Sequence, residues 1–239
     1  MVMGVAYGTT TLHQATKGIV QDGLVLNLDA GVRDSYDSGT TWRDLKRSNS
    51  GTLNNMNSNN LIKDRGGVLS LDGTDEYVEI PVVLGAASTS FTVSLWCKVN
   101  ALNGGNSPIF LSNYGPSARN DYWSIAKGTN NTSFIVRNDS RTNSGSVLIY
   151  HDFNGFKNFT IVRDHSNNKL DYYVNNSSNS ISFSGSDTIG SSPDGDIYIG
   201  RHLGRYLDGE VASVNVYNRA LTAAEVSKNF NVMRHRFGI

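Results

Sequence analysis

The most constraining feature of the sequence is the stretch 207–230, LDGEVASVNVYNRALTAAEVSKNF, in which a strand pattern passes directly into a helix pattern. After an Asp-Gly turn, apolar and polar residues alternate, and one face of the predicted strand is formed by Ala212, Val214 and Val216. From Thr222 onward the pattern is helical, because Thr222 is a suitable N-cap and Glu225 stands three residues later, as in a capping box. The stretch therefore predicts a strand of a sheet followed by one short C-terminal helix.

The rest of the chain consists of short alternating runs separated by turns rich in Gly, Asn and Ser. The clearest run is 91–99, whose apolar face comprises Phe91, Val93, Leu95, Cys97 and Val99. Cys97 is expected to be a buried small apolar residue. Trp96, on the opposite face, is either a cover for a neighbouring loop or a platform for a sugar. Further strands are predicted at 24–28, 68–71, 77–80, 109–111, 122–126, 133–137, 147–151, 159–163, 170–174 and 197–199.

About a dozen antiparallel strands with one terminal helix close best as two stacked sheets, so we expect an all-β sandwich. The turn 72–75, with Asp-Gly at its centre, is expected to join 68–71 to 77–80 as a hairpin. A second hairpin is expected over 159–174. The polar segment 34–60 is expected to be a long surface excursion, anchored by Trp42 and Leu45.

At 239 residues the chain is long enough for one large sandwich, and we assign a single domain to residues 23–239. Residues 1–22 lack periodicity and are expected to form an N-terminal arm outside the core, either disordered or docked on a partner. Residues 232–239 follow the predicted helix with no sheet position left for them, so they too are expected to be free for contacts. The N-terminus shows neither a signal-peptide pattern nor an apolar run of about 18 residues, which argues against both a secretion signal and a membrane span.

Several strings of the sequence resemble one family of domains. They are GLVLNLDAG, SGTTWRDL and GGVLSLDGTDEYVEI between positions 23 and 80, together with the stretch 207–230. These strings resemble laminin-G-like, concanavalin A-like lectin/glucanase jelly-roll domains, in the form found in structural proteins of tailed bacteriophages. The resemblance spans most of the chain. It implies a two-sheet antiparallel jelly-roll sandwich with one short C-terminal helix, and a calcium ion at one rim of that sandwich.

The charges of the chain are balanced. Lys plus Arg and Asp plus Glu both number 21, so the net charge is zero and no general field would attract nucleic acid or an anionic membrane. We therefore expect neither as a partner. Cys97 is the only cysteine, which excludes an intrachain disulfide and a zinc site built from cysteines.

Catalytic motifs are missing from the sequence. There is no Gly-x-Ser-x-Gly, and the five histidines are scattered without the spacing of metal ligands. Catalytic relatives of the resembled fold carry Glu-x-Asp-x-Glu on a central strand, and no such triplet includes any of the glutamates, Glu76, Glu79, Glu210 and Glu225. We therefore expect no enzymatic activity and assign no catalytic residue, with an enzyme built from aspartates as the alternative.

A calcium site takes about six to eight oxygen ligands, which loops rich in Asp and Asn can supply. The candidate metal ligands are Asp72 and Asp75 in the turn 72–75, and Asp208 before the last strand. Asp194 and Asp196 form a second candidate pair. The alternative is that these aspartates only make Asx turns.

Sugar binding needs an exposed aromatic ring that stacks on the apolar face of a sugar, together with polar groups for its hydroxyls. Such residues are found in the predicted loops at Tyr114, Tyr122, Trp123, Arg201, His202, Arg205 and Tyr206. They form a candidate lectin rim. The alternative is an ordinary exposed, tyrosine-rich set of loops.

The leading hypothesis is a non-enzymatic structural or decoration protein of a tailed-phage virion, assembled in the host cytoplasm and built on a lectin-like jelly roll. Its expected partners are other virion proteins or symmetry mates in a homo-oligomer, and host-surface glycans. The runner-up is a carbohydrate-binding adhesin module. A glycoside hydrolase is the third hypothesis.

Overall fold

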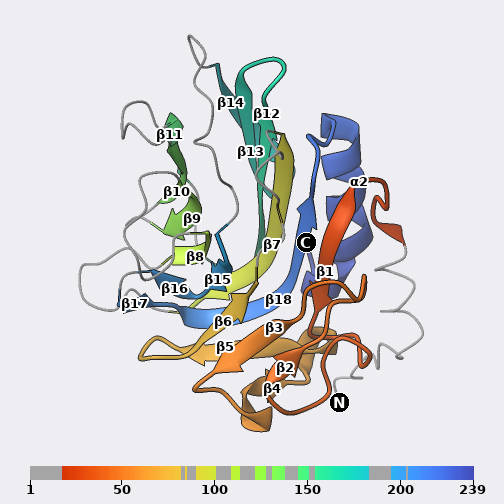
Figure 1. The fold of residues 1–239 in the computed structure, drawn as a ribbon, viewed down its shortest axis with the longest axis vertical. Helices are drawn as coiled ribbons and strands as arrows, with labels where there is room; N and C mark the ends of the chain where they lie inside the picture. The colour runs from red at the N-terminus through yellow and green to blue at the C-terminus, as the bar shows by residue number, and fades with distance from the viewer. Residues whose placement is uncertain are drawn as a thin grey trace.

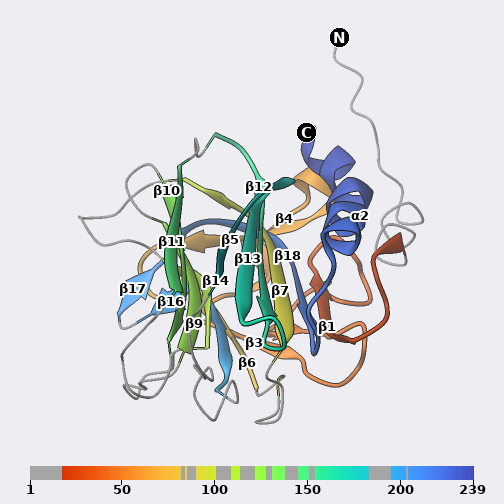
Figure 2. The ribbon, with the colours of Figure 1, turned by 90° about the horizontal axis from the view of Figure 1, so that it is seen from above.

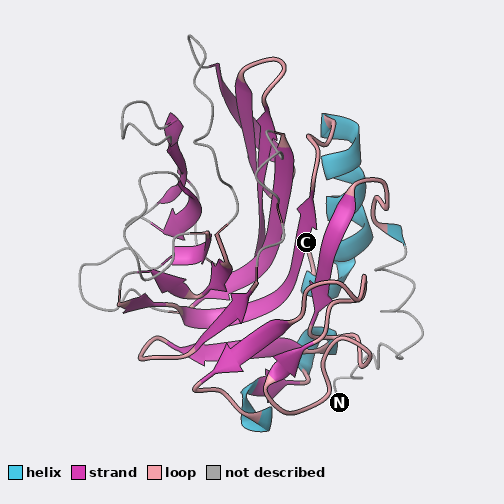
Figure 3. Cartoon of the chain, in the orientation of Figure 1, coloured by secondary structure: helices cyan, strands magenta, loops and turns pink. Residues whose placement is uncertain are grey.

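The computed structural model describes residues 18–81, 84, 90–100, 109–113, 122–127, 131–137, 145–150, 154–182, 195–202 and 204–239. These residues form two large antiparallel sheets that face each other, with one α-helix on the outer side of one sheet (Figures 1 and 3). Seen from above, the sheets are separate layers and the helix lies beside one of them (Figure 2). The predicted all-β sandwich with one short C-terminal helix is confirmed.

The first sheet lies next to the helix and is built around β7 and β18. Its strand order is β14-β13-β12-β7-β18-β5-β4, and β1 also pairs with β18. The strands are β14 (Ser177–Ser182), β13 (Lys169–Val174), β12 (Lys157–Asp164), β7 (Phe91–Val99), β18 (Asp208–Tyr217), β5 (Val68–Asp72), β4 (Leu61–Ile62) and β1 (Leu24–Asp29). β12 and β13 pair directly, which confirms the predicted hairpin over 159–174.

The second sheet forms the opposite layer, in the order β11-β10-β9-β8-β15-β6-β3-β2. Its strands are β11 (Gly145–Tyr150), β10 (Asn131–Arg137), β9 (Tyr122–Lys127), β8 (Ile109–Ser112), β15 (Ile197–Ile199), β6 (Tyr77–Ile80), β3 (Gly51–Asn54) and β2 (Thr41–Trp42). The smaller elements are the strands β16 (Arg201–His202) and β17 (Arg205–Tyr206), and the 3-10 helices η1 (Ser58–Asn60), η2 (Asp64–Gly66) and η3 (Arg234–Phe237).

The main hydrophobic core lies between the two sheets. Alternate residues of β7 enter it, as the sequence predicts, and Cys97 among them is completely buried. Burial raises the pKa of the Cys97 thiol far above its usual range. The predicted role of Cys97 as a small apolar core residue is confirmed.

A second core forms on the outer face of the first sheet, under α2 (Ala223–Met233). The ring of Trp96 stacks on Phe230 and on Phe237, with centroids 5.6 Å and 4.5 Å apart, and only 2% of Trp96 is exposed. Of the two interpretations of Trp96, the cover for a neighbouring segment is therefore correct, and the segment is the C-terminal helix. A buried ring cannot be a platform for a sugar.

The helix begins with the predicted capping box. The Thr222 hydroxyl accepts a hydrogen bond from the Glu225 N–H, and the Glu225 carboxylate accepts one from the Thr222 N–H. Arg219 donates two further bonds to Glu225, of 2.6 Å and 2.9 Å, and this interaction lowers the pKa of the Glu225 carboxyl to about 2.

No helix in the described part of the chain is long and apolar enough to cross a membrane.

The residues that follow the helix belong to the fold, so the expectation that 232–239 are free was wrong. The Arg236 guanidinium lies 2.7 Å from Asp29 Oδ1 and donates to the carbonyl oxygens of Arg65 and Gly67. The side chains of Arg236 and Asp29 are only 5% and 1% exposed, so water does not screen this ion pair. Periodicity could not reveal the pair, because its two members are 207 residues apart.

The end of the predicted N-terminal arm also belongs to the fold. Ile19 and Val20 are 3% and 7% exposed and lie in the second core with the helix. The Val20 N–H donates to Asn229 Oδ1 at 2.8 Å, and the Val20 carbonyl accepts from the Tyr217 hydroxyl at 3.1 Å. The predicted boundary after residue 22 is therefore too late. Residues 1–17 lie outside the described residues.

The turn 72–75 is not a hairpin. β5 belongs to the first sheet and β6 to the second, so this turn carries the chain from one layer to the other. An Asp-Gly turn shows that the chain reverses, but the pairing partners decide which sheet each strand joins. The segment 34–60 likewise contains β2 and β3, with Trp42 fully buried and Leu45 only half-buried, so it is partly sheet rather than a surface excursion.

A β-bulge changes the predicted face of Ala212. In β18 the register with β7 shifts between Val211 and Ser213. Val211, Val214 and Val216 therefore lie in the core between the sheets, whereas Ala212 lies in the second core under the helix. One extra residue in one strand reverses the alternation on either side of it, which a strict period of two does not anticipate.

Replacing Arg236 with Met should lower the free energy of unfolding by about 3–5 kcal/mol, because Asp29 would remain as a buried charge without its partner. Urea unfolding at neutral pH measures this change. Lys228→Ala, on the exposed side of the helix, is the control and should alter stability by less than about 0.5 kcal/mol. Adding Asp29→Asn to the Arg236→Met variant should recover part of the loss. A single variant as stable as the control would contradict the importance of the pair.

A chain that lacks residues 1–20 should be less stable than one that lacks residues 1–17. Only the longer deletion removes Ile19 and Val20 from the second core, and the loss of two buried aliphatic side chains should cost roughly 2–4 kcal/mol. Urea unfolding of the two truncated proteins side by side gives the difference. Equal stability would show that these residues do not contribute to the domain.

Candidate functional site

A short antiparallel ribbon carries four of the residues predicted to bind a ligand. β16 and β17 pair Arg201 with Tyr206 and His202 with Arg205. The ribbon leaves β15 at Gly200, whose φ of 78° lies in the left-handed region. A Cβ at this position would lie 2.4 Å from a side-chain atom of β5, so only glycine fits the bend that starts the ribbon.

The ribbon brings its residues next to two tyrosines of the second sheet. The Arg201 guanidinium carbon lies 4.4 Å from the ring centroid of Tyr77 and 5.8 Å from that of Tyr198. The ring of Tyr77 lies 6.3 Å from Tyr198 and 6.4 Å from Tyr206, and both pairs are tilted. We call these four residues, Tyr77, Tyr198, Arg201 and Tyr206, the tyrosine–arginine patch.

The alternation of β6 and β15 directs the tyrosines outward, because the residues between them fill the core; these core residues are Val78, Ile80, Ile197 and Ile199. Tyr198 pairs in register with Glu79, and its hydroxyl donates to Glu79 Oε1 at 3.2 Å. Burial, together with the neighbouring Glu79 carboxylate, raises the pKa of Tyr198 to about 12. The Tyr198 phenol is therefore neutral at ordinary pH and holds the carboxylate in place.

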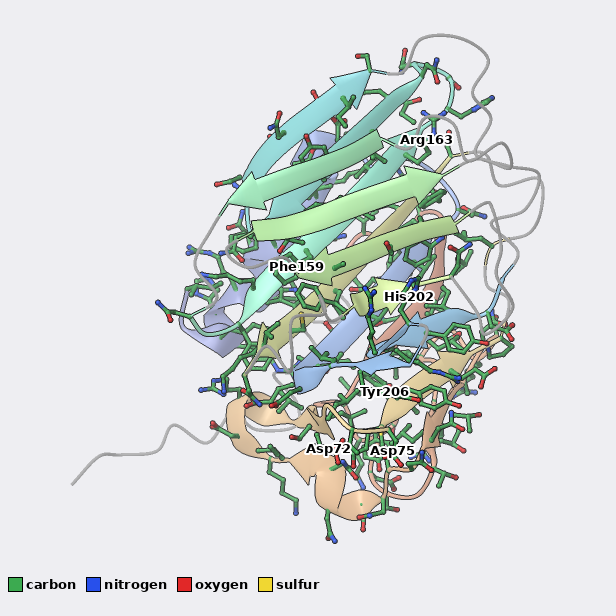
Figure 4. All side chains as sticks on the ribbon, turned by 90° about the vertical axis from the view of Figure 1, so that its left-hand side faces the viewer. Asp72, Asp75, Phe159, Arg163, His202 and Tyr206 are labelled. Carbon is green, nitrogen blue, oxygen red and sulfur yellow. The ribbon has the colours of Figure 1, made fainter. Side chains whose placement is uncertain are left out.

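The patch combines groups that suit a polyhydroxylated, uncharged ligand. Tyr77, Arg201 and Tyr206 are half-buried, which leaves part of each side chain exposed. A tyrosine ring can stack on the apolar face of a sugar, while a guanidinium donates to hydroxyls and a carboxylate such as Glu79 accepts from them. Arg205 on the ribbon is exposed, and His202 is 8% exposed. Figure 4 shows His202 and Tyr206 near the middle of the side of the molecule that lies on the left in Figure 1.

Trp123 does not belong to a sugar-binding surface, contrary to the sequence prediction. It is completely buried, and its ring lies 6.0 Å from that of Phe91 in the core between the sheets. The strand predicted at 122–126 is present as β9, and Trp123 lies on its inward face, so the assignment of Trp123 to a loop of the rim was wrong. Tyr122 begins the same strand, and its side chain lies outside the described residues, as does Tyr114.

The proposed calcium ligands do not form a metal cluster. Asp72 and Asp208 are cross-strand partners in β5 and β18, so these two lie close together as predicted. Asp72 Oδ1 accepts from the Thr74 N–H at 2.8 Å, as in an Asx turn. Among the described residues, no three His, Cys, Asp or Glu side chains are grouped so that they could hold a metal ion. Figure 4 shows Asp72 and Asp75 at the lower end of the molecule. Of the second pair, Asp194 lies outside the described residues.

Every glutamate of the chain is engaged in an interaction within the fold. Each carboxylate accepts a hydrogen bond or forms an ion pair with a neighbouring side chain. The partners are Asn60 for Glu76, Tyr198 for Glu79, Lys98 for Glu210 and Arg219 for Glu225. These contacts give each glutamate a structural role, and Glu79 also lies beside the tyrosine–arginine patch.

Two members of the patch, Tyr77 and Tyr198, were missed as ligand-binding candidates. Their signal is visible in the sequence. Tyr198 stands between two isoleucines in a short strand, and Tyr77 begins a short strand and precedes a valine. A strict alternation puts such residues on the face that does not enter the core. What the sequence does not show is that β6, β15 and the ribbon lie side by side.

Solved structures with a similar fold include binding domains of botulinum neurotoxins. The botulinum neurotoxin serotype D binding domain aligns with a TM-score of 0.69 at 14% identity over 91% of this chain and 52% of its own. The receptor binding domain of the botulinum neurotoxin C/D mosaic serotype gives 0.67 at 13% identity, over 87% and 51%. The binding domain of Paraclostridial Mosquitocidal Protein 1 gives 0.65 at 17% identity, over 87% and 52%. This chain thus spans about half the length of those structures.

Comparison at the level of sequence gives a family assignment. No curated protein sequence matches the chain. The profile described as the concanavalin A-like lectin/glucanases superfamily, of the laminin G type, matches residues 72–227. The matched region includes the turn after β5, most of both sheets, the tyrosine–arginine patch and the start of the C-terminal helix. The chain belongs to the concanavalin A-like lectin/glucanases superfamily.

Proposed function

We propose that this domain binds a carbohydrate without cleaving it, at the tyrosine–arginine patch. The observation that carries the proposal is the assembly of two tyrosine rings and one guanidinium around the ring of Tyr77, with the Glu79 carboxylate beside them. The lectin-like fold and its likeness to domains named for binding support the same assignment.

A bound sugar would place an apolar ring face against an exposed part of Tyr77 or Tyr206. Arg201 would donate to hydroxyl oxygens, and Glu79 would accept from a hydroxyl group on the same ligand. Arg201 and Glu79 carry opposite charges, so the patch as a whole suits a neutral sugar. An open site with few contacts binds one sugar weakly, and several copies of the domain on one assembly would raise the avidity.

The engagement of all four glutamates supports binding rather than hydrolysis. Glycoside hydrolysis uses two carboxylates on opposite sides of the scissile bond, one of them with a raised pKa. Glu79 is held by Tyr198, and Glu225 has a pKa of about 2, so it carries no proton to donate at ordinary pH. Glu76 also accepts from the Asp72 N–H at 2.8 Å, which makes it part of the turn.

We also propose that the domain is carried on the virion of a tailed phage as a structural or decoration protein. What supports this role is the resemblance of the strings between 23 and 80 and over 207–230 to structural proteins of such phages. Other virion proteins or symmetry mates would be its partners, and glycan binding would attach the particle to a host surface. Mass spectrometry of purified particles tests this role, and particles that lack the protein would refute it while leaving the carbohydrate proposal intact.

A glycan array followed by titration calorimetry should identify a saccharide that binds the wild-type domain. Tyr206→Ala and Arg201→Ala should each weaken that binding about tenfold, since each removes a contact of roughly 1–1.5 kcal/mol. Both residues are half-buried on a surface ribbon, so the unfolding midpoint should change little. Lys63→Ala is the control. Lys63 is exposed and follows β4 at the edge of the first sheet, outside the patch, so this variant should bind as the wild type does.

The same saccharide should be recovered uncleaved after long incubation with the protein. Release of reducing ends that a single Asp or Glu replacement abolishes would contradict the non-enzymatic assignment. An array with no binder, or patch variants that bind as tightly as the wild type, would contradict the location of the site.

A further inference from the structure

A pocket of about 810 Å³ lies between β1 and the loop that leads from β1 to β3, and it shares no residue with the tyrosine–arginine patch. The loop lies at the lower end of the molecule in Figure 1, around β2. The basic residues of its lining are Arg33, Arg43, Lys46 and Arg47, and the acidic ones are Asp34, Asp37 and Asp44. We call it the basic pocket.

Asp44 is the residue that shapes the loop, and its charge is compensated within the loop. Its Oδ1 accepts from the N–H groups of Asn27 and Lys46 at 2.9 Å and 3.0 Å. Its Oδ2 accepts from the N–H groups of Ser48 and Asn49 at 3.0 Å and 3.1 Å. Four backbone donors therefore hold the Asp44 carboxylate, which is only 3% exposed, so it is not free to pair with the cations of the pocket.

Asp37 is likewise engaged. Its Oδ1 lies 2.5 Å from Arg43, and that hydrogen bond lowers the pKa of the Asp37 carboxyl. Arg43 also donates to the carbonyl oxygens of Asp34 and Arg33, which fixes its guanidinium in place. The charges of Arg43 and Asp37 therefore balance each other at one wall of the pocket.

Three cations remain, Arg33, Lys46 and Arg47. All three are exposed, and within the described part of the chain none of their side chains forms a hydrogen bond or ion pair. Asp34 is the one lining carboxylate that is not compensated by the contacts above. The charged lining side chains that are left without a partner are therefore three cations and one carboxylate, an excess of positive charge, although the whole chain has zero net charge.

The backbone of Arg47 gives a second reason to regard this arrangement as functional. Arg47 has a φ of 64°, a conformation that costs free energy for any residue with a Cβ. The loop maintains it through the Arg47 N–H, which donates to the Asp44 carbonyl at 2.8 Å, and through the bonds from Ser48 and Asn49 to the Asp44 carboxylate. These bonds fix the direction in which the Arg47 side chain leaves the loop.

We propose that the basic pocket binds a tetrahedral oxyanion, a sulfate or phosphate ester group carried on a ligand. Guanidinium groups bind such oxygens in bidentate fashion, and an ammonium adds a mobile point charge. Single exposed ion pairs contribute little, so the ligand needs more than one negative charge to be held by the three cations together. The site does not depend on the carbohydrate proposal, because neutral sugars would still bind the patch if the pocket bound nothing.

Titration calorimetry on the whole chain at low salt tests the proposal with four probes: inorganic sulfate, inorganic phosphate, a sulfated tetrasaccharide and the same tetrasaccharide without sulfate. We expect saturable binding of the sulfated tetrasaccharide, several-fold weaker at about 200 mM than at about 20 mM salt. The desulfated form should not compete for the pocket. Tighter binding of the sulfated saccharide than of either inorganic ion identifies a saccharide-borne ester as the ligand, and equal binding identifies the free ion.

Two sets of variants decide the location. Lys46→Ala with Arg47→Gly should weaken binding at least tenfold, and glycine accepts the φ of Arg47, so the unfolding midpoint should not fall. Arg33→Gln is the second variant. Arg33 also lines the pocket, so this variant should weaken binding as well, and it tests the location if the first variant does not fold. Lys63→Ala and Lys228→Ala, which remove exposed lysines elsewhere, are the matched controls. No binding of any anionic probe, or equal losses in the controls and the pocket variants, would overturn the proposal.

Discussion

The pairing of β18 with β7 is the interaction on which the rest of the structure depends. The two strands pair from Gly209 opposite Val99 to Tyr217 opposite Thr92, with the bulge between Val211 and Ser213, and all of β18 after Asp208 is buried. A strand buried on both faces needs a layer on each side. The second sheet supplies one layer and the C-terminal helix with its following turn supplies the other, which is why this sandwich has a helix packed on its outside.

The two ends of the described chain complete that outer layer. Ile19 and Val20 pack beside the helix, and Arg236 reaches back to Asp29 at the end of β1. Removing two charges from water is costly, so such a pair is stable only when its remaining donors are satisfied, as those of Arg236 are by two carbonyl oxygens. The pair therefore specifies how the C-terminus closes on the sheet.

The two proposed binding surfaces differ in chemistry. The tyrosine–arginine patch stands on β6, β15 and the ribbon of the second sheet, where aromatic rings and a balanced Arg201 and Glu79 suit a neutral sugar. The basic pocket lies in a loop stabilised by Asp44, where the side chains of Arg33, Lys46 and Arg47 form no hydrogen bond or ion pair within the described part of the chain. A domain with both surfaces can distinguish a saccharide that carries ester groups from one that does not.

The sequence by itself determined those features that depend on neighbours in the chain. Alternation located β7 and β18 and predicted the burial of Cys97, and the spacing of Thr222 and Glu225 located the start of the helix, because side-chain direction and capping are local properties. Only the tertiary structure decided which sheet β5 and β6 join, that Trp123 is buried, that Asp29 meets Arg236, and that Tyr77 meets Arg201. Each of these depends on contacts between segments far apart in the chain, and no local pattern encodes the partner.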